Sequence, residues 1–63
     1  MNKIAFVRQL GGQVLLFDAL GREYARVCGE LINYGSDFVL VDNGGGGYQL
    51  YDSDGRWLRP VQK

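Results

Sequence analysis

The chain alternates between short apolar segments and turn clusters of glycine, asparagine and aspartate. The apolar segments are rich in β-branched and aromatic residues and are too short for stable helices, so the pattern predicts strands. The predicted strands cover residues 3–8, 13–18, 22–33, 38–42, 48–52 and 56–61. We therefore expect an all-β protein.

Two of the predicted strands are apolar on both faces. Val14, Leu15, Leu16 and Phe17 follow one another without a polar residue, and the segment 38–42 has the same character. A strand with one solvated face alternates apolar and polar residues, so an unbroken apolar run indicates that both faces are covered. In a chain of this size a barrel interior is expected to cover one face, and a second subunit is predicted to cover the other.

The segment 22–33 is the longest predicted strand, and Gly29 lies in its middle. Glycine inside a strand is typical of a bulge or a sharp bend, so this strand is expected to bend and to serve two faces of a barrel. A short helix over residues 22–28 is the alternative, because residues 22–26 have fair helix propensity. Gly21 and Gly29 would limit that helix to less than two turns.

One phrase occurs twice in the chain. Leu16-Phe17-Asp18 and Gly21-Arg22 recur 34 residues later as Leu50-Tyr51-Asp52 and Gly55-Arg56. An apolar pair that leads into aspartate and glycine is typical of a strand entering a tight turn, in which the carboxylate binds its own backbone and glycine takes a positive φ. The same shift, without a gap, places Val7 on Val41, Gly11-Gly12 on Gly45-Gly46, and Val27 on Val61. Two interpretations are open: a duplicated three-stranded meander, or two similar glycine-rich hairpins that are unrelated.

The number and length of the strands favour a small, SH3-like, partly open antiparallel barrel of five to six strands, with residues 1–63 in a single domain. Two stretches resemble known families. Gly29-Glu30-Leu31 and then Asp37-Phe38-Val39-Leu40 are similar to part of the Sm-like RNA-binding rings, although the N-terminal helix of that family is missing here and the spacing from Gly21 is longer. Residues 51–56 resemble the tyrosine–aspartate repeat of large secreted β-cage proteins, which contain many tandem copies. Neither short stretch is assigned to a family.

Size and composition favour association with another chain. A domain of 63 residues buries only about 60% of the surface of its unfolded chain, so it needs reinforcement. A single cysteine excludes a disulfide within the chain, and the absence of histidine leaves few metal ligands. A partner subunit is the reinforcement that is left, and we expect a homo-oligomer.

Charge and the N-terminal sequence limit the partners and the location. Seven basic and seven acidic residues give a formal net charge of zero, which does not favour nucleic acid. The N-terminus lacks the long apolar run of a signal peptide or a membrane span. We expect a complete, small, cytoplasmic gene product with no membrane partner.

The residues that catalysis usually needs are scarce, so we expect no enzyme, no cofactor and no metal. Without histidine the chain has no ordinary serine or cysteine nucleophile–base pair. Cys28 is predicted to be a small buried apolar residue, and Asp18 and Asp52 are predicted to serve their own turns. The run from Gly44 to Gly47 is not followed by the Gly-Lys-Ser/Thr of a phosphate-binding loop and is predicted to be a flexible hairpin tip.

Binding is the function that these exclusions leave, and the last hairpin supplies the candidate residues. These are Tyr48, Tyr51, Arg56, Trp57 and Arg59, of which alternation places Trp57 and Arg59 on one face. Aromatic and arginine side chains together are typical of protein-interface hot spots, and they also stack single-stranded bases. The alternative is that Trp57 and one tyrosine complete the core.

We accordingly expect a non-enzymatic binding module that self-associates and acts through protein–protein interaction. By analogy, stand-alone proteins of this kind are often accessory or inhibitory products of a phage or mobile element. A single-stranded nucleic-acid-binding Sm/SH3-like barrel is the first alternative. A small-molecule-binding oligomer, with a pocket closed by the glycine loop, is the second.

Overall fold

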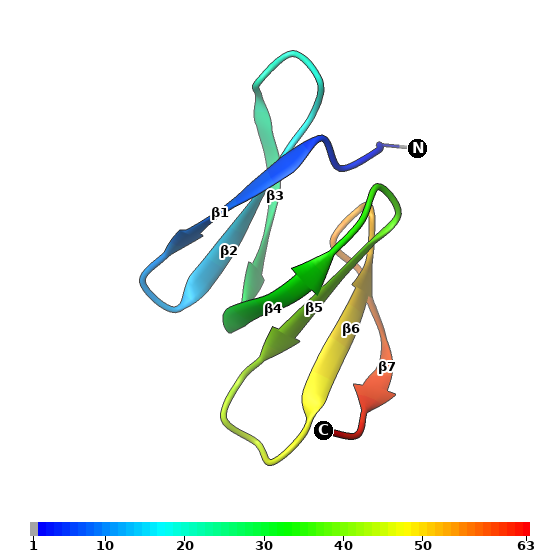
Figure 1. Ribbon diagram of the computed structural model, residues 1–63. Helices are drawn as coiled ribbons and strands as arrows, with labels where there is room; N and C mark the ends of the chain where they lie inside the picture. The colour runs from blue at the N-terminus through cyan, green and yellow to red at the C-terminus, as the bar shows by residue number, and fades with distance from the viewer. Residues whose placement is uncertain (1) are drawn as a thin grey trace.

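The computed structural model describes residues 2–63, which form seven strands in two antiparallel sheets and contain no helix (Figure 1). The first sheet has the order β1-β2-β3, and the second has the order β4-β5-β6-β7. The strands are β1 (Phe6–Leu10), β2 (Gln13–Phe17), β3 (Glu23–Cys28), β4 (Glu30–Tyr34), β5 (Phe38–Asp42), β6 (Tyr48–Asp52) and β7 (Trp57–Val61). The all-β prediction is confirmed. No helix in residues 2–63 is long and apolar enough to cross a membrane.

Gly29 divides the longest predicted strand in two. Its φ of +130° lies in a region that side-chain-bearing residues rarely adopt, and its N–H donates to the carbonyl of Gly12 at 2.7 Å. The chain leaves the first sheet as β3 and enters the second as β4, so the predicted bend is confirmed. The prediction of one continuous strand over 22–33 is wrong, and so is the alternative of a helix over 22–28.

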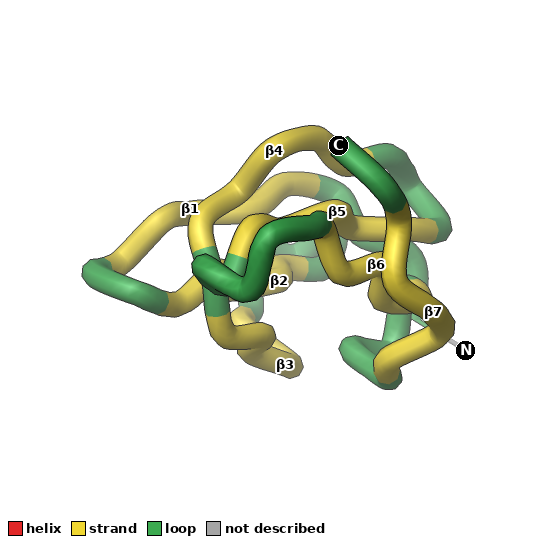
Figure 2. The backbone as a smooth tube through the Cα atoms, turned by 90° about the horizontal axis from the view of Figure 1, so that it is seen from below, coloured by secondary structure: helices red, strands yellow, loops and turns green. Residues whose placement is uncertain are grey.

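The two sheets pack around one apolar core and are not closed into a barrel, so the predicted barrel is not confirmed. The core residues come from both sheets and from the segment before β1. They are Ile4, Val14, Leu16, Val27, Val39 and Val41. Figure 2 shows β1 and β4 near one another on one side, with β3 and β7 at the far ends of their sheets.

A glutamine side chain joins β1 to the start of β4. The Gln9 amide nitrogen donates to the carbonyl of Gly29 at 3.0 Å, and its oxygen accepts the N–H of Leu31 at 2.7 Å. These are the two bonds that a peptide group of a neighbouring strand would make. Gln9 therefore links the edges of the two sheets, a role that its sequence position did not indicate.

On the far side of the core, the Tyr24 hydroxyl of β3 donates to the carbonyl of Ser53, the buried residue after β6. Burial, and then the charge of Asp54, raise the pKa of Tyr24. Replacing Tyr24 with phenylalanine leaves this carbonyl without its donor and is expected to lower the free energy of unfolding by about 1–2 kcal/mol. Urea denaturation measures the loss, and Tyr34→Phe, at an exposed tyrosine, is the control. Equal losses for the two variants would contradict this role.

The two repeated turns have the same hydrogen bonds. Asp18 Oδ1 accepts the N–H groups of Leu20 and Arg22 at 3.0 Å, and Asp52 Oδ1 accepts those of Asp54 and Arg56 at 2.9 and 3.0 Å. The closing glycines have φ values of +81° for Gly21 and +85° for Gly55. The predicted role of both aspartates in their own turns is confirmed.

The repeat extends into the strands on either side of the turns, but not to β1 and β5. The pairs Val14↔Val27 and Leu16↔Ala25 correspond to Tyr48↔Val61 and Leu50↔Arg59, and a bulge follows at Leu16/Phe17 and at Leu50/Tyr51. In the first sheet Leu16 lies opposite Val7, whereas Leu50 lies opposite Leu40 and not Val41. The gap-free superposition of Val7 on Val41 is therefore one residue out of register.

This slip changes which face of each sheet is buried. Directly paired residues share a face of a sheet, and successive residues alternate. Val14 and Leu16 are fully buried in the first sheet, but in the second sheet the fully buried residues are Val39 and Val41, opposite Tyr51 and Gln49. The repeated halves thus direct opposite faces into the core, and Leu50, the counterpart of Leu16, lies on the outside.

Candidate interaction surface

We call the surface of the second sheet that faces away from the core the outer face. It carries an apolar cluster. Leu40 of β5 and Leu50 of β6 pair at its centre, and both are only half-buried. Ile32, which is 43% exposed, lies at the bulge of β4 beside them. The other apolar members are Phe38, Tyr48 and Val61.

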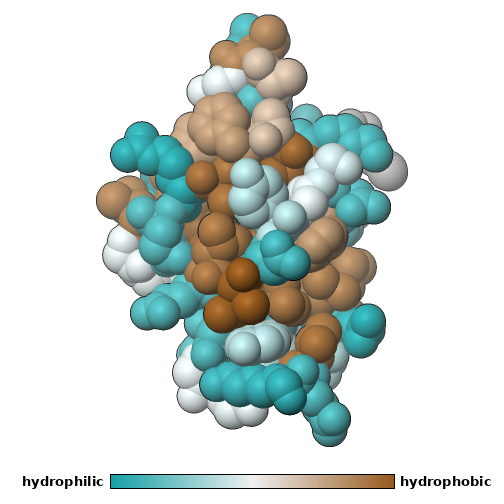
Figure 3. Space-filling model, viewed as in Figure 1, coloured by the Kyte–Doolittle hydropathy of each residue, from teal (hydrophilic) through white to brown (hydrophobic). Residues whose placement is uncertain are grey.

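Apolar surface is concentrated in the middle of the view in Figure 3, over the area where Figure 1 places β4 and its neighbours. Single exposed apolar residues are ordinary on protein surfaces, but a contiguous apolar patch marks an interaction site. The unbroken apolar run of β5 was the sequence signal for this surface, since Leu40 alternates with two fully buried valines.

Charged residues border the outer face on both sides. Glu30 on β4 is exposed, and Arg59 on β7 lies directly opposite Leu50. Lys63 Nζ lies 3.1 Å from Asp42 and 5.7 Å from the centre of the Tyr48 ring. The backbone N–H of Gly44, and then Lys63, hold the pKa of Asp42 below its usual range.

The predicted binding residues are divided between the two faces of the second sheet. Tyr51 packs against the core with Trp57 opposite it, while Tyr48 and Arg59 lie on the outer face. The bulge at Leu50/Tyr51 places Trp57 and Arg59 on opposite faces, so the prediction that they share one face is wrong. Trp57 is 55% exposed, and its indole N–H donates to Gln49 Oε1 at 2.6 Å. Arg56 is exposed in the turn between β6 and β7.

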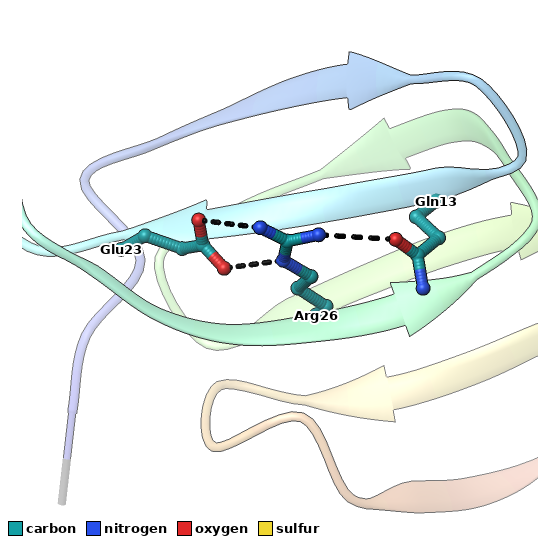
Figure 4. Close-up of polar contacts among 3 residues, drawn as sticks. All are labelled: Gln13, Glu23 and Arg26. Carbon is teal, nitrogen blue, oxygen red and sulfur yellow. Dashed lines mark hydrogen bonds and ion pairs between the residues drawn. The ribbon is translucent and has the colours of Figure 1, made fainter.

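The outer surface of the first sheet is partly covered by its own side chains. The Arg26 guanidinium binds Glu23 and, at 3.2 Å, Gln13 Oε1, and it therefore lies along this surface (Figure 4). Leu15 pairs with Arg26 and is only 7% exposed. The hydrogen bond from Arg26 lowers the pKa of Glu23. Leu15 is thus buried without a second subunit, and the expectation that a second subunit covers the outer side of β2 stays a prediction.

The glycine run forms most of the loop between β5 and β6, where Gly44 and Gly46 have φ values of +86° and +88°. Gly44 donates to Asp42 Oδ1 at 2.8 Å. An open recess of about 500 Å³ lies beside this loop. Its lining includes Gly12, Cys28, Gly29, Glu30, Asp42, Asn43 and Gly44. Cys28 is exposed at this recess, so the prediction that it is buried is wrong.

Residues 2–63 contain no group of three or more histidine, cysteine, aspartate or glutamate side chains that could hold a metal ion. No family model matches the chain, and searches of curated proteins and of solved structures find no significant match. The candidate site is therefore defined by its geometry, and the outer face is its main feature.

Proposed function

We propose that this protein is a non-enzymatic binding module that self-associates, with the outer face as the surface on which a second copy packs. The half-buried pair of Leu40 and Leu50 at the centre of the outer face carries the proposal. Two sheets that pack face to face bury apolar side chains about 10 Å apart, as in a β-sandwich. The outer face offers such apolar side chains. Leu50 occupies the same position in the repeat as the buried Leu16, but its side chain lies on the outer face.

The distribution of charge favours a second copy as the occupant. Glu30 lies on the β4 side of the outer face and Arg59 lies on the β7 side, while Lys63 is already paired with Asp42. A two-fold axis parallel to the strands places β4 of one copy over β7 of the other. Each acidic border then meets a basic border, whereas an axis across the strands would place like borders together.

The test is the oligomeric state of a variant that disrupts only this surface. Leu50→Thr keeps a strand-forming residue but removes apolar area from the centre of the outer face, so it is expected to raise the dissociation constant at least tenfold. Native mass spectrometry and light scattering from about 1 to 100 µM measure the change. Leu20→Thr is the control, because Leu20 is 75% exposed in the first turn.

A monomeric wild-type chain at all these concentrations would refute the proposal. If Leu50→Thr changes neither the size of the wild-type assembly nor its dissociation constant, the outer face is excluded as a site of association. Arg59→Glu should also weaken the assembly, and Glu30→Arg in the same chain should restore it, because the double variant exchanges the two borders.

A further inference from the structure

The two sheets have four edge strands, and β3 is the one that carries neither a proline nor a link to another edge. The edges of β1 and β4 are linked by Gln9. The edge of β7 carries Pro60, which has no N–H to offer to another strand. β3 contains no proline and is hydrogen-bonded to β2 on one side only.

The repeat shows which backbone groups of β3 are free. The bond from Gly29 N–H to the Gly12 carbonyl marks that pair as hydrogen-bonded, and bonded pairs alternate along an antiparallel ladder. The pair Leu15↔Arg26 is therefore a non-bonded one, so the N–H and C=O of Arg26 point away from β2. Its counterpart 34 residues later is Pro60, opposite Gln49. At this position β7 has a proline, which has no N–H to donate, whereas β3 has an arginine whose N–H is free to donate to another strand.

A second outward-pointing peptide group lies at Glu23. The bulge removes Tyr24 from the ladder, and Phe17↔Glu23 becomes the next non-bonded pair after Leu15↔Arg26. The edge of β3 therefore presents free backbone groups at Glu23 and at Arg26, which carry side chains of opposite charge. In one chain these two side chains bind each other on the exposed surface of the sheet.

We infer that β3 is a site of strand pairing with β3 of a second copy, antiparallel and with Glu23 of each chain opposite Arg26 of the other. This register pairs outward backbone groups with outward backbone groups and acid with base on both sides of the two-fold axis. It joins two three-stranded sheets into one sheet of six strands. The contact is distinct from the outer face, which belongs to the other sheet, so one chain can use both.

Two charge variants test this contact, and both carry Leu50→Thr so that association through the outer face does not contribute. With Leu50→Thr alone the chain is expected to dimerise through β3. Adding Glu23→Arg makes both positions basic, and adding Arg26→Glu makes both acidic, so each variant alone should dimerise about tenfold more weakly. Mixed in equal amounts, the two should form a heterodimer in native mass spectra. If the two substitutions acted only by breaking the ion pair within each chain, mixing the variants would not restore dimerisation.

Arg26→Pro in the same background is the second test. It copies the residue of the equivalent position on β7, where the backbone accepts proline, and it should abolish pairing while the circular dichroism spectrum remains that of a folded β protein. A folded Arg26→Pro chain that still dimerises would overturn the inference, and so would a mixture of the charge variants that stays monomeric. The mixing result does not depend on the outer face, so failure of the proposed function and failure of this inference are distinguishable.

Discussion

Replacing Gly29 with alanine is expected to leave a large fraction of the molecules unfolded. A residue with a side chain at a φ of +130° costs about 1–3 kcal/mol in backbone strain. The new Cβ would also lie 3.0 Å from Cβ and Cγ2 of the fully buried Val41, and relieving such crowding costs about 1–3 kcal/mol more. A domain of 63 residues has a total stability of about 3–9 kcal/mol, so the combined loss is comparable with the whole.

Urea denaturation followed by circular dichroism measures this loss. Gly12→Ala is the matched control, since Gly12 is the hydrogen-bond partner of Gly29 but has no positive φ, and no atom lies within 4 Å of the place that its new Cβ would take. The control should differ from wild type by less than about 1 kcal/mol. A Gly29→Ala chain as stable as the control would show that the junction of β3 and β4 tolerates an ordinary backbone conformation.

The bend at Gly29 could be predicted from the sequence, but the passage of the chain from the first sheet to the second could not. Glycine in the middle of an apolar segment indicates a bend on steric grounds alone. Whether the chain bends within one sheet or leaves it depends on which surface the next strand meets, and that is a tertiary property. Here the side chain of Gln9, far away in the sequence, binds the backbone on both sides of Glu30 and holds β4 beside β1.

The turns were the most predictable part of the molecule, because their hydrogen bonds are local. Asp18 and Asp52 bind backbone groups two and four residues ahead, so the residues that decide the geometry are neighbours in sequence. The face of each strand was less predictable. A bulge or a slip of one residue transfers a side chain to the other face of a sheet, and neither has a clear signal in the chain. This is why alternation failed for Trp57 and Arg59.

The one-residue slip between the two halves of the repeat gives Leu16 and Leu50 different environments, although both lie in the strand before an equivalent turn. Substitutions at the two positions should therefore have different effects on stability. Leu16 is fully buried between the sheets, so Leu16→Ala removes a core side chain and is expected to cost about 3–4 kcal/mol. Leu50 occupies the equivalent place before the second turn but lies half-buried on the outer face. Leu50→Ala is expected to cost only about 1 kcal/mol in a dilute, monomeric sample.

The dependence on protein concentration separates the two positions further. Binding to the folded state alone raises the apparent stability, so the melting temperature of a chain that self-associates rises with concentration. Leu16→Ala should lower the melting temperature by a similar amount at every concentration, because it weakens the core of each chain. Leu50→Ala should lower it more at high concentration, where the outer face of wild type is occupied. Equal, concentration-independent losses for the two variants would mean that Leu50 contributes only to its own chain.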